Sequence, residues 1–157
     1  MLKEKQLPII NDKLDNLIDE IDYLNAYNPK KGLPDSIFYF VGRNTPLINV
    51  DLIIRDVDGS ILMTWRDDKY SGQGWHIPGG IIRFQEKIEN RIKMVAKTEL
   101  GISISEQCKF LEINEIIVPR KKDRSHFISL LYECEINKAA NVTLNENIIK
   151  DNKMMPP

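Results

Sequence analysis

Residues 75–102 constrain the fold of this chain more than any other segment. Two adjacent glycines, Gly79 and Gly80, follow a proline here, and without side chains they let the backbone approach another group closely. Residues 86–100 then have the composition of a helix, and Gly101 supplies the left-handed residue that commonly closes one. The sequence therefore predicts a tight turn followed by a central helix.

One acidic residue of this helix, Glu99, lies on the face that is expected to be buried. It falls in the same helical sector as three apolar residues, Ile88, Ile92 and Val95. An ionised carboxylate on a buried face requires a partner, either a cation or an arginine. We favour a metal ion over a structural salt bridge, because the Gly79 carbonyl can offer a neutral oxygen to the same ion. Magnesium fits such oxygen ligands best.

Strand patterns flank this segment on both sides. Residues 47–54 and 61–65 are apolar and surround an Asp-Gly dipeptide, so they are expected to form a hairpin. Two more strands are expected over residues 110–118 and 127–136. Together these patterns predict a mixed α/β (α+β) fold, with a mixed β-sheet sandwiched between helices.

An extra helix is predicted at the N-terminus. Leucine and isoleucine recur at helical spacing over residues 11–27, and acidic residues fill the other positions. Prolines and a glycine over residues 29–34 indicate a linker. Residues 1–34 are thus expected to be an appendage to one domain, residues 35–157. Packing on the core or on a second copy is the expected role of this helix, and recruitment of another partner is the alternative.

Composition limits the partners. The 22 basic and 23 acidic residues leave a net charge of -1, so no overall positive field holds nucleic acid or an anionic membrane. No apolar run is long enough to span a membrane, and no signal peptide is expected. Cys108 and Cys134 form no CxxC pair, which argues against a structural zinc site and a dense disulfide framework. These features predict a cytoplasmic protein that binds neither nucleic acid nor membrane.

The central segment resembles the Nudix box, whose pattern is Gx5Ex7REUxEExGU. The residues in register with the box are Gly80, Glu86, Glu99, Gly101 and Ile102. At three positions where the box has Arg, Glu and Glu, this chain has Met94, Val95 and Thr98. The last metal-binding glutamate of the box is therefore kept, whereas the carboxylates at positions 95 and 98 are absent.

The GDP-mannose mannosyl hydrolases relax the box in a similar way, and their wider pattern resembles residues 40–136. The shared features are residues 43–47, Asp51, Arg66 and residues 72–75. By this resemblance, the Gly79 carbonyl and Glu99 bind one magnesium ion, while Asp51 and Arg66 contact the nucleotide sugar. The planar guanidinium of Arg66 also suits a diphosphate on chemical grounds.

The resemblance also implies a reaction. Water attacks the anomeric carbon with inversion, and GDP and free sugar are released; magnesium and Arg66 would stabilise the departing diphosphate. The family places its base histidine in a loop that corresponds to residues 143–147, where Glu146 is the candidate substitute as base or metal ligand. His126, beside a basic turn, is a candidate phosphate contact, whereas His76 is expected to pack.

Three functions stay open at this point. The first is magnesium-dependent hydrolysis of GDP-mannose or a related nucleoside diphosphate sugar by a homodimer. The second is a Nudix pyrophosphohydrolase that cuts between the phosphates. The third is a catalytically weak Nudix-fold module that binds nucleotide sugars. The family usually continues with another strand and a helix, so truncation is expected to leave part of the site missing or supplied by a second subunit.

Overall fold

The computed structural model describes residues 6–24, 27–55, 59–68, 72–104, 108–119, 124–135 and 152–155. The helices in chain order are α1 (Leu7–Leu24), the short 3-10 helix η2 (Pro29–Lys31), α2 (Asp35–Asn44) and α3 (Ile88–Leu100). The strands are β1 (Leu47–Ile54), β2 (Ile61–Asp68), β3 (Gly72–His76), β4 (Gly79–Ile81), β5 (Lys109–Ile117), β6 (His126–Cys134) and β7 (Asn152–Met155).

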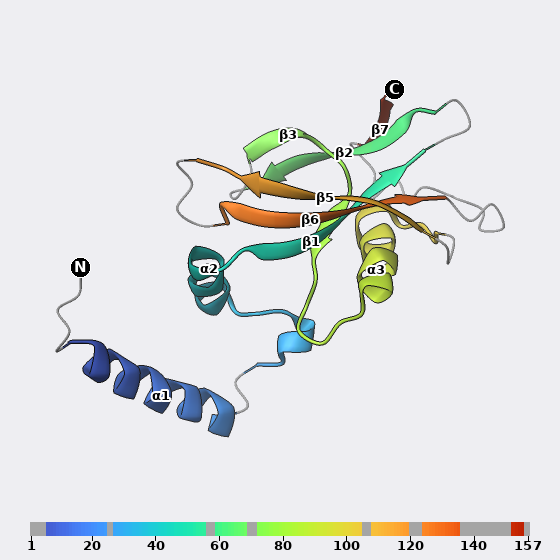
Figure 1. Ribbon diagram of the computed structural model, residues 1–157. Helices are drawn as coiled ribbons and strands as arrows, with labels where there is room; N and C mark the ends of the chain where they lie inside the picture. The colour runs from blue at the N-terminus through green and yellow to red at the C-terminus, as the bar shows by residue number, and fades with distance from the viewer. Residues whose placement is uncertain are drawn as a thin grey trace.

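The strands form two sheets, which Figure 1 shows one above the other. The larger sheet has the order β4-β1-β6-β5, and the smaller has the order β3-β2-β7. In the larger sheet β1 runs parallel to β6, whereas β4 and β5 run antiparallel to their neighbours. The predicted mixed α/β fold with an extra N-terminal helix is thus confirmed.

One face of the larger sheet forms the core with α3. Val50, Leu52 and Ile54 alternate along β1 and are fully buried. The residues of α3 that join the same core are Ile92, Val95, Ala96 and Leu100. Burial of each large side chain stabilises the fold by about 1.5–3 kcal/mol. The opposite face of β1 is therefore free to carry polar residues.

The predicted helix is present, with corrected bounds. It begins at Ile88, because Lys87 has an extended backbone, and it ends as predicted at Gly101, whose φ is 68°. The Gly101 and Ile102 amides donate to the carbonyls of Lys97 and Ala96, which closes the last turn.

The predicted hairpin between residues 47–54 and 61–65 is wrong. Both strands exist, but β1 pairs with β4 and β6, while β2 pairs with β3 and β7 in the other sheet. A bridge between Arg55 and Ile61 joins them.

Helix α2 was not predicted, because its segment is rich in aromatic and β-branched residues and includes Gly42. This helix leads into β1, and some of its residues line a cleft beside the larger sheet.

The two cysteines are not apart in space. Cys108 and Cys134 form a disulfide between the start of β5 and the end of β6. The pairing of Lys109 with Glu133 in neighbouring strands brings them together. This finding removes the cysteine argument for a reducing compartment. No helix among the described residues is both long and apolar enough to cross a membrane.

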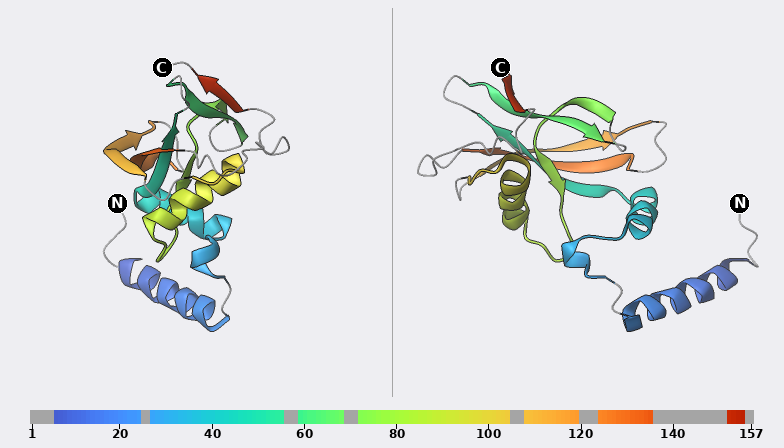
Figure 2. Two further views of the ribbon diagram at one scale, coloured as in Figure 1. Left: turned by 90° about the vertical axis from the view of Figure 1, so that its right-hand side faces the viewer. Right: turned by 180° about the vertical axis from the view of Figure 1, so that it is seen from behind.

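Helix α1 lies away from the two sheets, as Figures 1 and 2 show. It spans Leu7–Leu24, so it begins earlier than predicted. Large apolar side chains of this helix are between 41% and 56% exposed: Leu7, Ile9, Ile10, Leu14, Leu17 and Ile18. The helix therefore buries little apolar surface against the rest of its own chain.

Candidate active site

The second face of the larger sheet carries polar residues in register across the strands. Three rows of paired residues run across it, each separated from the next by two residues along β1. The carboxyl row is Gly79, Asp51 and Leu131. The amide row is Asn49, Ser129 and Asn114. The apolar row is Leu47, Phe127 and Ile116. These nine residues lie along a cleft of about 1330 Å³.

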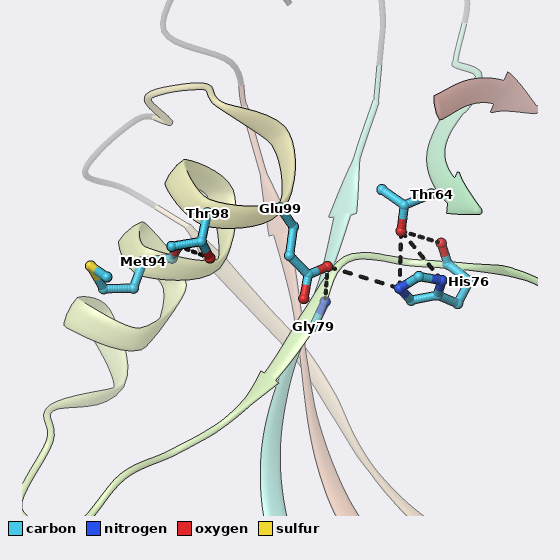
Figure 3. A network of polar contacts seen from close by, with 6 residues as sticks. All are labelled: Thr64, His76, Gly79, Met94, Thr98 and Glu99. Atoms are coloured by element: carbon cyan, nitrogen blue, oxygen red, sulfur yellow. Dashed lines mark hydrogen bonds and ion pairs between the residues drawn. The ribbon is translucent and has the colours of Figure 1, made fainter. Parts of the chain in front are cut away.

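Glu99 reaches from α3 to the carboxyl row. The Gly79 amide donates a hydrogen bond of 3.3 Å to the Glu99 Oε2 atom (Figure 3). Burial raises the pKa of Glu99 to about 7; the Gly79 amide and the Arg66 charge oppose this rise, and the Asp51 carboxyl adds to it. Glu99 is therefore only about half ionised near neutral pH, and an approaching positive charge favours its ionised form.

Asp51 lies directly across from Gly79 in the paired strands. Its Oδ2 atom accepts a hydrogen bond from the Ser129 hydroxyl. Burial raises the pKa of Asp51, while the Ser129 hydrogen bond and the Arg66 charge lower it in part. The cleft thus holds two carboxyl groups whose ionised forms are both disfavoured by burial.

The paired glycines allow close packing of neighbouring groups, in addition to the close approach of the backbone to a ligand. A Cβ atom on Gly79 would collide with the Asp51 carboxylate, and it would lie 3.1 Å from the Val50 carbonyl. On Gly80 a Cβ atom would lie 2.8 Å from the Val95 Cγ2 atom on α3. Gly79 therefore lets Asp51 approach β4, and Gly80 lets α3 pack against the same strand.

Two side chains from the smaller sheet complete this end of the cleft. Arg66 of β2 lines the cleft, and its charge lowers the pKa of both Asp51 and Glu99. His76 of β3 lies with its Nε2 atom 3.9 Å from Glu99 Oε2 and 3.0 Å from the Thr64 hydroxyl (Figure 3). His76 was expected to pack, with contact to substrate as the alternative. The pairing of Thr64 with His76 across β2 and β3 brings it to the cleft, and this pairing is not visible in the sequence.

Comparison with known proteins identifies the family. The sequence profile of the NUDIX domain matches residues 45–157, which is most of the chain. The chain belongs to the Nudix family. The resemblance of residues 75–102 to the Nudix box is thus confirmed, and the assignment places this protein among the Nudix hydrolases.

Several relatives of this Nudix protein are informative. The low-salt glycan biosynthesis protein Agl8 of Haloferax volcanii is 25% identical over 118 residues, which cover 71% of this chain and 73% of that protein. The MutT NUDIX hydrolase of Burkholderia pseudomallei has a TM-score of 0.55 at 19% identity, covering 73% of this chain and 77% of that one. The NUDIX domain of Shewanella oneidensis NrtR, solved with ADP ribose, has a TM-score of 0.52 at 19% identity, covering 87% and 82%. The structural likenesses confirm the Nudix fold.

In this Nudix protein, the glutamate at the start of the box has a structural partner. The Arg91 Nη2 atom lies 2.7 Å from Glu86 Oε2, and Arg91 Nε donates to the same oxygen at 2.8 Å. The Arg83 amide also donates to Glu86 at 2.9 Å. The box has its arginine at position 94, three residues later, where this chain has an exposed methionine. Arg91, one helical turn earlier, supplies the guanidinium that neutralises Glu86.

The other departures from the box lie away from the carboxyl row. The Thr98 hydroxyl donates to the Met94 carbonyl at 2.7 Å within α3, as Figure 3 shows. Val95 is buried in the core. Glu99 is therefore the residue of this helix that presents a carboxylate to Gly79.

Two residues singled out in the sequence lie elsewhere. His126 has the same alternation along β6 as Tyr132 and Cys134, which places it on the core face, and its Nε2 atom lies 3.0 Å from Glu115 Oε1. The structure thus does not bring His126 to Asp51 and Arg66. Glu146 lies outside the described residues.

The carboxyl row suits a divalent cation that shares its shell with a ligand. Asp51 and Glu99 offer hard carboxylate oxygens, and their raised pKa values show that nearby positive charge is too weak to offset burial. Within the described part of the chain, no cluster of three or more His, Cys, Asp or Glu residues is able to hold a metal ion by itself. The remaining ligands would be the Gly79 carbonyl, water or phosphate oxygens.

Proposed function

We propose that this Nudix protein hydrolyses GDP-mannose or a related nucleoside diphosphate sugar, with magnesium, to the nucleoside diphosphate and free sugar. The observation that carries the proposal is the Glu99 carboxyl held at the Gly79 amide, with Asp51 and Arg66 in the same cleft. Magnesium typically uses one or two protein carboxylates together with substrate phosphates. Glu99 and the Gly79 carbonyl would hold this ion.

The proposed chemistry gives each residue a separate task. Water forms a bond to the anomeric carbon, and the bond between this carbon and the phosphate oxygen breaks, so the diphosphate leaves with the electron pair. Arg66 faces the leaving diphosphate, whose negative charge grows as the bond breaks. Asp51 would hold the sugar, and Glu146 is proposed to accept the proton of the water. Bound magnesium would add further positive charge beside the diphosphate.

Two of the relatives support a nucleotide-linked sugar as the ligand class. The Haloferax protein is named for glycan biosynthesis. The Shewanella NUDIX domain was solved with ADP ribose, which is itself a nucleoside diphosphate joined to a sugar. The cleft extends beyond the carboxyl row, so it has room for a base and a sugar on the two sides of a diphosphate.

Product analysis tests the proposal. Purified protein is incubated with GDP-mannose, UDP-glucose and ADP-ribose in magnesium, and the products are separated by anion-exchange chromatography. Nucleoside diphosphate plus free sugar is the expected result. Nucleoside monophosphate plus sugar phosphate would instead show cleavage between the phosphates. Binding of these compounds without turnover would show a binding module.

The matched variants are Glu99→Gln and Glu89→Gln. Both lie on α3, but Glu89 is exposed in the first turn, whereas Glu99 lies in the cleft. Glu99→Gln is expected to lower turnover by at least tenfold because the metal loses its carboxylate ligand, and Glu89→Gln is expected to leave turnover unchanged. Equal turnover in the two variants would remove Glu99 from the mechanism.

We further propose that the protein is a homodimer formed through α1. Leu14, Leu17 and Ile18 share one face of this helix and are each more than 40% exposed, so a second copy would cover them. Leu14→Glu is expected to shift the mass measured by light scattering from two chains to one. Tyr23→Lys, on the opposite side of the helix and 86% exposed in the native chain, is the control.

A further inference from the structure

The cleft extends well beyond the carboxyl row. Along β1 the cleft-facing residues are Asp51, Asn49 and Leu47, and alternate residues of a strand are spaced by about 7 Å. The apolar row therefore lies roughly 13 Å from the carboxyl row. If the diphosphate of a ligand occupies the carboxyl row, then the group at the other end of that ligand is the part that reaches the amide and apolar rows.

The middle row contains a polar atom without a partner. The Asn49 Oδ1 atom is buried and accepts no hydrogen bond from any residue that the structure describes. Folded proteins leave few buried acceptors unpaired, because an unpaired acceptor has lost its hydration without compensation. The side chain lines the cleft, and a small rotation of its amide would turn this oxygen toward a donor on a ligand.

The outer row provides flat surfaces. The Arg124 guanidinium lies 5.5 Å from the centre of the Phe38 ring on α2 and 6.0 Å from that of Phe127 on β6. All three residues line the cleft. Aromatic rings and guanidinium planes are the surfaces on which proteins stack nucleobases.

Helix α2 is held over this end of the cleft by close packing. Gly42 is buried in α2, and a Cβ atom there would lie 3.6 Å from the Leu47 side chain and 3.7 Å from the Arg124 amide nitrogen. These are ordinary van der Waals distances, so α2 lies in contact range of β1 and of the residues just before β6. The aromatic wall is therefore built into the fold and does not depend on a bound ligand.

We infer that the end of the cleft beneath α2 is a nucleobase site. The base stacks on the wall formed by Phe38, Arg124 and Phe127, and the Asn49 Oδ1 atom accepts a hydrogen bond from an amino group on the base. This inference rests on the proposed function in one respect, namely that the diphosphate occupies the carboxyl row. It predicts a preference that the proposed reaction alone does not set: bases with an amino group bind more tightly than bases without one.

Pairs of nucleotides that differ in this group test the inference in the native protein. GDP and IDP differ only by the amino group of the purine ring, and CDP and UDP differ by an amino group and an oxygen. Titration calorimetry in magnesium is used to compare ADP, GDP and CDP with IDP and UDP. At least one amino-bearing nucleotide is expected to bind about tenfold more tightly than its counterpart, because one hydrogen bond to a buried acceptor is lost. Equal affinity for all five would overturn the inference.

Variants then assign the preference to Asn49. Asn49→Leu has nearly the same shape but no acceptor, so the affinity ratio within the discriminating pair is expected to fall to about one. Phe38→Leu is expected to weaken all five nucleotides alike and to keep the ratio, because stacking does not depend on the amino group. Asn90→Leu, exposed on α3, is the control and should change neither affinity nor ratio. An unchanged ratio in Asn49→Leu would contradict the assignment.

The outcomes for the base site and for the proposed reaction are separable. A ratio that collapses in Asn49→Leu, in a protein that hydrolyses no nucleotide sugar, would keep the base site and reject the reaction. Hydrolysis with an unchanged ratio would reject the base site and keep the reaction. The native titrations need no substitution, so a variant that folds poorly does not affect them.

Discussion

The raised pKa of Glu99 makes the folding stability of this protein depend on pH in a defined way. Burial raises the pKa from its ordinary value of 4.5 to about 7. A folded-state pKa above the unfolded value means that the folded chain holds the proton more tightly. The stability contributed by the protonated carboxyl is complete below about pH 4.5, and it is lost as the pH rises through about 7.

The magnitude follows from the size of this rise. One pKa unit corresponds to about 1.4 kcal/mol, so the loss between the ends of this pH range is at most about 3 kcal/mol. The Glu99 side chain is 29% exposed, and water around it screens part of the effect. We therefore expect native protein to lose about 2 kcal/mol more stability than Glu99→Gln across this range.

Urea denaturation in EDTA, at about pH 4.5 and about pH 8, measures this difference. Other groups also titrate, so the quantity of interest is the change in native protein minus the change in Glu99→Gln, with Glu89→Gln expected to behave as native. Addition of magnesium at the higher pH should restore stability to native protein and not to Glu99→Gln, since only an ionised carboxylate binds the ion. The same pH dependence in native protein and Glu99→Gln would refute this account of the buried carboxyl.

Three more substitutions follow from the packing of the site. Gly79→Ala is expected to destabilise the fold by about 1–3 kcal/mol in urea denaturation, because its Cβ atom meets Asp51, whereas Gly74→Ala has open space and should be neutral. Arg91→Ala should lower the melting temperature and cost about 3 kcal/mol, since it leaves Glu86 without its guanidinium; Arg83→Ala, exposed, is the comparison. Arg66→Lys should weaken GDP binding about tenfold in calorimetry, because an ammonium cannot make two parallel bonds to a diphosphate. Neutral effects of these changes would contradict the contacts described.

The central segment was predictable because its signals are local. Helical spacing alone puts Glu99 on the face with Ile92 and Val95, and the structure places that face against the sheet and Glu99 at Gly79. The end of the helix at Gly101 follows from the backbone freedom of glycine. Such features depend on neighbours within a few residues.

Features that depend on strand pairing were not predictable in this way. The contact between Asp51 and Ser129 depends on the register between β1 and β6, which are far apart in the sequence. The contact between Thr64 and His76 depends on the pairing of β2 with β3, in a different sheet from the one expected. The disulfide has the same origin, since β5 and β6 bring its cysteines together. The hairpin prediction was wrong because an Asp-Gly turn specifies only that the chain reverses direction, and it does not specify which sheet each strand joins.

The loss of carboxylates from the Nudix box changes how this site could bind a metal ion. The lost carboxylates were at positions 95 and 98, and among the described residues Asp51 and Glu99 are the acidic residues whose pKa values burial raises. In the proposed reaction, two carboxylates beside one arginine would hold an ion loosely compared with a full set, so a ligand diphosphate would have to contribute oxygens before the ion is held firmly. Ion and diphosphate then stabilise each other by the same factor, as two ligands of one site must. Residues proposed to anchor the rest of the ligand, such as Asn49 in the middle row of the cleft, would therefore strengthen the binding of the ion without touching it.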